Sequence, residues 1–72
     1  MNIEIKKRKM VFKAYRKPHA QMYHQYRING KRVTYGEYEI KRKKLSLWQP
    51  FVKSYVTFKR SGNVVEVDEM QI

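Results

Sequence analysis

The chain contains no cysteine, and only three glycines and two prolines among its 72 residues. Without cysteine, neither a disulfide nor a thiolate metal site can stabilise a chain this short. The low glycine and proline content, together with 42% hydrophobic and 14% aromatic residues, excludes the composition of a disordered tail. The sequence therefore predicts a single folded domain over residues 1–72, whose stability depends on how well its small core packs.

Long hydrophobic runs are missing as well. No stretch approaches the ~18 apolar residues that a membrane-spanning helix needs. The N-terminal segment MNIEIKKRKM carries cations, but no apolar stretch follows them as it would in a secretory signal. We therefore expect no membrane partner, and a cytoplasmic location is the default expectation.

Acidic residues are scarce and unevenly placed. The chain has 17 Lys and Arg against six Asp and Glu, a net charge of +11. The first sixty residues hold all 17 cations and three of the acids, a net +14, whereas the last twelve hold the other three acids and no cation. A small domain stays soluble with a net charge of roughly 2 to 8. The excess indicates a polyanionic partner, whose binding would be sensitive to salt.

The usual signatures of catalysis and metal binding are absent from the sequence. The two histidines, His19 and His24, are five residues apart, which fits neither a helical metal pair nor one face of a strand. His24 is better explained as a packed neutral side chain beside Met22 and Tyr26. The serines lack a nucleophile motif, and the glycines are too dispersed to cradle a phosphate. We expect no enzyme activity, no metal and no cofactor.

The first half of the chain has the pattern of strands. Residues 2–15 are typical of a strand with an exposed or bulged middle at the four cations of residues 6–9, and a turn is expected near Pro18. Residues 21–28 alternate between an apolar and a polar face, as in a half-buried antiparallel strand. Asn29 and Gly30 then predict a tight turn, because both residues tolerate positive φ.

The segment after this turn permits two interpretations. Residues 31–41 could form the second arm of a hairpin. Alternatively, Thr34 and Glu37 form a capping box, and Val33 and Tyr38 form a hydrophobic staple at the start of a helix. We favour a helix over residues 35–45, with one stripe of side chains facing the core and Ile40 off that stripe. The stripe consists of Tyr35, Tyr38, Arg42 and Leu45.

The C-terminal part predicts a hairpin. Residues 51–59 place Val52, Val56 and Phe58 on one face, residues 60–63 supply a turn, and residues 63–70 continue as a strand. Trp48, just before this hairpin, is expected to fill the core, with an interface anchor as the second alternative and base stacking as the third. The predicted fold is α+β, with about four antiparallel strands and one helix in the order strand, strand, helix, strand, strand. If the helix fails to form, five short strands favour an all-β small barrel.

Pairs and runs of cations, interleaved with aromatic residues, are the candidate functional feature. Cations neutralise phosphates, and flat aromatic rings can stack on unpaired bases. In a helix, four successive cations point around most of the circumference, so residues 41–44 cannot all line one groove, and Arg42 is expected to lean over the core. The predicted nucleic-acid contacts are Lys31, Arg32, Lys41, Lys43, Lys44, Arg16, Lys17, Lys59 and Arg60.

Two hypotheses for function follow. The first is a small basic protein that binds DNA or RNA through phosphate contacts, with unknown sequence specificity. The second is a small interaction module, an inhibitor or adaptor of the kind that phages or mobile elements encode, that docks on an acidic or nucleic-acid-bound host protein. The chain could act as a monomer or as a homodimer through a strand edge, for instance that of the first or last strand.

Overall fold

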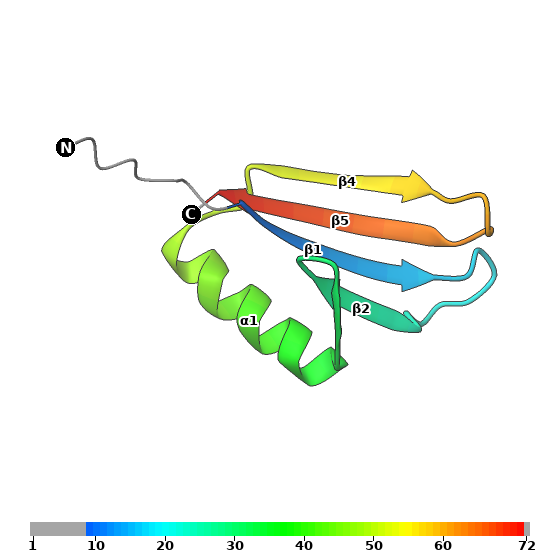
Figure 1. Cartoon of the computed structure of the whole chain (residues 1–72), viewed down its shortest axis with the longest axis horizontal. Coiled ribbons are helices and arrows are strands. Elements are labelled where there is room, and N and C mark those ends of the chain that lie inside the picture. The colour runs from blue at the N-terminus through cyan, green and yellow to red at the C-terminus, as the bar shows by residue number, and fades with distance from the viewer. Residues whose placement is uncertain (1–8, 72) are drawn as a thin grey trace.

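The computed structural model describes residues 9–71, which form a five-stranded antiparallel sheet with one helix packed on one face (Figure 1). This confirms the predicted α+β class. In chain order, the elements are β1 (Lys9–Arg16), β2 (Gln25–Ile28), β3 (Lys31–Val33), α1 (Tyr35–Trp48), β4 (Lys53–Phe58) and β5 (Val64–Gln71).

The strand order β3-β2-β1-β5-β4 gives an open sheet, so the alternative of a small barrel is wrong. β3 is a strand of three residues that the four-strand prediction lacked. β1 and β5, the first and last described strands, lie in the middle and pair with neighbours on both sides. The free edges of the described sheet are therefore β3 and β4, and the prediction of a dimer edge at the first or last strand is wrong. Residues 2–8 of the predicted first strand lie outside the described residues.

The predicted turns are present. Asn29 and Gly30 have φ values of 52° and 82°, so the Asn-Gly pair makes the tight β2–β3 connection that only residues tolerant of the left-handed region allow. Asn29 also joins this turn to β1, because its backbone N–H donates to the Val11 carbonyl and its side-chain oxygen accepts from the Val11 N–H. A second turn surrounds Pro18, where the Ala20 N–H donates to the Lys17 carbonyl.

Helix α1 begins at the predicted cap. The Thr34 hydroxyl accepts a hydrogen bond from the Glu37 N–H at 3.3 Å, which satisfies one of the free donors of the first turn. Val33 packs against the same core cluster as Tyr38, as the staple requires. The segment after the Asn29–Gly30 turn thus forms the short strand β3 and then helix α1. The hairpin interpretation and the helix interpretation of this segment were each partly right.

The core between the helix and the sheet is built around Phe12, which is 0% exposed. The Phe12 ring meets the rings of Tyr38 on α1 and Phe51 after α1 edge to face, with centroids 5.8 Å and 5.9 Å apart. Arg42 adds a polar link from α1 to β5, since two of its nitrogens lie 2.9 Å from Asp68 Oδ2. Arg42 also lies over the Phe51 ring, so the expectation that it leans over the core is confirmed.

Two side chains that were predicted to be packed, Trp48 and His24, are exposed instead. Trp48 is 87% exposed, because Phe51 takes the core position against Phe12. His24 is exposed because β2 begins only at Gln25, which leaves the predicted residues 21–24 in the loop.

The apolar face of β4 also lacks the cover that its pattern suggested. Val56 and Phe58 are exposed, whereas Tyr55 and Thr57 on the opposite face are half-buried. The reason is that α1 lies over β1 and β2 and leaves the helix-side face of the β4 edge open (Figure 1). Within residues 9–71, no helix is long and apolar enough to cross a membrane.

The Thr34 cap gives a test of the helix start. We expect Thr34→Ala to lower the free energy of unfolding by about 1 kcal/mol, because it leaves the Glu37 N–H without its acceptor. Thr34→Ser keeps an oxygen in the same place and is expected to retain most of the stability. Urea denaturation of the three proteins measures the difference, and equal losses in both variants would contradict the role of the hydroxyl.

Candidate functional site

The two faces of the sheet differ in what covers them, and the register between the strands shows which residues lie on each face. The even-numbered residues of β1, such as Phe12 and Ala14, face α1. The odd-numbered residues of β1 and their cross-strand partners point the other way, onto a surface that we call the open face. No described helix covers it, because the one helix in residues 9–71 packs on the opposite side.

The open face has an apolar stripe that is buried without a covering helix. Tyr15, Val65 and Val67 form its centre, with Val11 and Tyr55 packed against them. Tyr15 is only 6% exposed, since the Lys59 ammonium lies 4.8 Å from the centre of its ring and the Arg27 guanidinium 5.9 Å. Cationic side chains thus cover the stripe with their stems and hold their charges at the surface.

Three cations lie side by side across the open face. Lys13 of β1 is directly opposite Arg27 of β2, and Arg27 is directly opposite Arg32 of β3. We call Lys13, Arg27 and Arg32 the cation row. Like charges at directly opposed positions destabilise a sheet, so the row costs stability in the free protein. Arg27 is held in place by hydrogen bonds to the Gln25 side chain at 3.2 Å and the Gly30 carbonyl at 3.4 Å.

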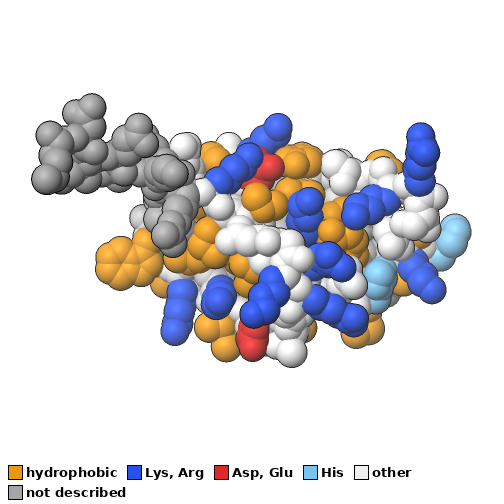
Figure 2. Space-filling model, in the orientation of Figure 1, with side chains coloured by type: hydrophobic (Ala, Val, Ile, Leu, Met, Phe, Trp, Pro, Cys, Tyr) orange, Lys and Arg blue, Asp and Glu red, His pale blue; other side chains and the backbone are white. Residues whose placement is uncertain are grey.

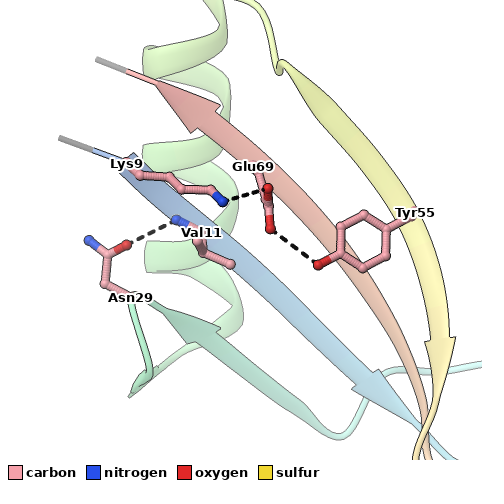
Figure 3. Close-up of polar contacts among 5 residues, drawn as sticks. All are labelled: Lys9, Val11, Asn29, Tyr55 and Glu69. Carbon is pink, nitrogen blue, oxygen red and sulfur yellow. Dashed lines mark hydrogen bonds and ion pairs between the residues drawn. The ribbon is translucent and has the colours of Figure 1, made fainter. Parts of the chain in front are cut away.

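Glu69 is the acidic residue that the register places on the open face, and its charge is already neutralised. Lys9 Nζ lies 2.9 Å from one carboxylate oxygen, and the Tyr55 hydroxyl donates to the other at 3.1 Å (Figure 3). The Lys9 hydrogen bond and charge lower the pKa of Glu69 below its usual value. Lys53 adds a further cation nearby, 4.9 Å from the centre of the Tyr55 ring.

The other two acids of β5 face the helix. Asp68 pairs with Arg42, and Glu66 stands opposite Ala14 in the register. Both line a groove of about 690 Å³ beside α1, together with Tyr23, Tyr26 and other residues. The register thus sends two of the three C-terminal acids to the helix side and leaves the open face strongly cationic. Lys and Arg side chains are spread over the surface in view in Figure 2, where acidic side chains are few.

Four of the predicted site residues come together at one end of the sheet. The β1–β2 loop and the β4–β5 turn both lie at this end (Figure 1). We call this set the basic end, and it consists of Arg16, Lys17, Lys59 and Arg60. Lys59 connects the basic end to the open face through its contact with the Tyr15 ring.

The other five predicted residues do not form one surface. Arg32 belongs to the cation row, whereas Lys31 lies directly opposite Ile28 and is therefore on the helix side of the sheet. Lys41 lines a groove with Lys31 and Arg32 beside β3, so these three lie near one another. Lys43 forms an ion pair with Glu39 at 2.9 Å, and Lys44 is an exposed helix residue. Their roles as phosphate contacts stay a prediction.

Sequence reasoning missed Lys13, Arg27 and Lys53 because it looked for runs of cations. These three residues are isolated in the chain, and only the register between strands brings them onto one face. A usable signal was present in the alternation of side chains along a strand, because residues two apart lie on the same face. Lys13 therefore shares a face with Tyr15, and Lys53 shares a face with Tyr55. Single cations two residues from a tyrosine were therefore a signal for the cations of the open face that the search for runs did not use.

Comparisons of the chain with protein-family models, with curated protein sequences and with solved structures found no match. No related protein therefore indicates what the open face binds.

The Glu69 cluster predicts a specific dependence of stability on pH. A carboxyl whose pKa is lower in the folded protein stabilises the fold above its unfolded pKa, and this contribution is lost as the pH falls through the folded pKa. The difference in unfolding free energy between the wild type and Glu69→Gln is therefore expected at neutral pH and should vanish in acid. Urea denaturation from about pH 7 to about pH 3 measures it, and a difference independent of pH would contradict the role of the charge.

Proposed function

We propose that the protein is a small, non-enzymatic, basic nucleic-acid-binding protein whose open face contacts the phosphate backbone. The observation that carries the proposal is the cation row, in which Lys13, Arg27 and Arg32 lie directly opposite one another across three strands. This arrangement is unfavourable in the free protein and becomes favourable when a polyanion neutralises it.

The form of the open face supports phosphate contacts rather than base stacking there. The Tyr15 ring is covered by Lys59 and Arg27, so a base cannot lie on it without displacing them. These cations are already ordered by ring contacts, and Arg27 also by hydrogen bonds, so less side-chain entropy is lost when they meet a phosphate. Contacts of this kind position a nucleic acid without reading its sequence.

Charge-neutralising variants test which surface binds. Labelled DNA and RNA oligonucleotides are titrated over a range of salt concentrations with the wild type, with Lys13→Gln/Arg32→Gln and with the matched control Lys43→Gln/Lys44→Gln. We expect the open-face variant to weaken binding and to reduce the slope of log K against log salt by roughly 0.7 to 0.9 for each phosphate that it no longer neutralises. The helix control should bind nearly as well as the wild type.

The same variants report on stability, which separates weakened binding from impaired folding. Lys13→Gln/Arg32→Gln removes both like-charge neighbours of Arg27, so it should raise the free energy of unfolding by roughly a few tenths of a kcal/mol. An equal loss of binding in the helix control would place the contacts elsewhere. Failure of the wild type to bind any oligonucleotide at low salt would end the proposal.

A protein partner is the second candidate, and one observation favours it. Leu47 and Trp48, side by side at the end of α1, are both more than four-fifths exposed, and Val52 close after them is exposed too. Clustered exposed apolar side chains of this kind mark protein interfaces. Affinity capture with and without nuclease distinguishes the candidates, because a partner held at Trp48 survives nuclease and is lost in Trp48→Ala.

A further inference from the structure

An exposed aromatic ring lies beside the basic end. Phe58, the last residue of β4, is 81% exposed on the helix-side face of the sheet, where α1 does not reach. Val56, two residues earlier on the same face, is 54% exposed. β4 therefore presents a flat apolar strip that nothing in the described part of the chain covers.

Cations of the basic end lie near this ring. Arg16 and Phe58 are both direct partners of Val64, so they lie on the same face at a distance of about two strand spacings, or roughly 10 Å. Arg60 follows two residues after Phe58 in the chain, whereas the Lys59 ammonium lies over the Tyr15 ring on the open face. An accessible aromatic face near cations is the combination that binds single-stranded nucleic acid, since every base has a face that can stack.

The charges next to the apolar strip define how a single strand of nucleic acid would lie on it. Glu66 is directly opposite Val56 in the register, so the inner end of the strip has a carboxylate beside it. Further inward lies the groove lined by Glu66, Asp68 and Tyr23. Phosphates are repelled from these acids and attracted to Arg16 and Arg60 at the outer end. The backbone should therefore follow the outer end, with the bases pointing inward over Phe58 and Val56.

We infer that the preferred ligand is single-stranded nucleic acid, with an unpaired base stacked on Phe58 and its phosphates held by the basic end. This rests on the proposed function for the class of ligand, and it adds the strand state of the ligand and a stacking residue on the face of the sheet opposite the open face. A base inside a duplex is already stacked on its neighbours, so its face is not available to Phe58. The duplex would engage the cations alone.

The experiment separates stacking from charge by removing the bases. At one fixed low salt concentration, three labelled ligands of equal length are compared by fluorescence anisotropy: a single-stranded oligonucleotide, its duplex, and an abasic strand with the same phosphates. Each is titrated with the wild type, with Phe58→Ala and with the control Trp48→Ala, which removes an exposed aromatic side chain far from the basic end in sequence. Circular dichroism confirms that the variants fold.

The wild type is expected to bind the single strand at least about fivefold more tightly than the abasic strand, the smallest gain that one stacked base gives. Phe58→Ala should remove most of this preference and keep binding to the abasic strand, whereas Trp48→Ala should leave both unchanged. Equal affinity of the wild type for the two strands, a preference for the duplex, or a preference that survives Phe58→Ala would overturn the inference while leaving the proposed function standing. Only a failure to bind all three ligands would remove both.

Discussion

The packing of Phe12 is the constraint on which the rest of the structure depends. Phe12 lies in the central strand β1, is fully buried, and meets aromatic rings from within α1 and from just after it. An aromatic cluster of this kind contributes a large part of the hydrophobic stabilisation available to a chain of this length. It fixes α1 to one face of the sheet, and the alternation of β1 then sends Lys13 and Tyr15 to the other face.

The position of the helix explains where charge accumulates. Glu66 and Asp68 face α1, and Asp68 stabilises its docking through Arg42, whereas Glu69 on the open face is neutralised by Lys9. Lys53 is also opposite Glu69 in the register, whereas Lys13, Arg27 and Arg32 of the cation row lie opposite one another without an acidic partner. A fold selected for stability alone would alternate the signs of directly opposed charges. Binding a polyanion gives a physical reason for the arrangement.

Local features were predictable from the sequence, and features that depend on distant contacts were not. The Asn29–Gly30 turn and the Thr34 cap were predicted because each depends on residues close in the chain. The order of the strands, which makes β1 and β5 central, and the exposure of Phe58 and Trp48 depend on where α1 docks. Among the candidate contacts, the basic end came from runs of cations, but Lys13 and Arg27 required the register between strands.

The most direct test of the central claim, that the open face binds nucleic acid, is a map of backbone amide chemical shifts during titration with an oligonucleotide at low salt. The account predicts the largest changes at Lys13, Tyr15, Arg27 and Arg32, with further changes at the basic end and little change along the outward side of α1 at Ile40, Lys44 and Leu47. Changes concentrated on α1, with the strands unaffected, would contradict it.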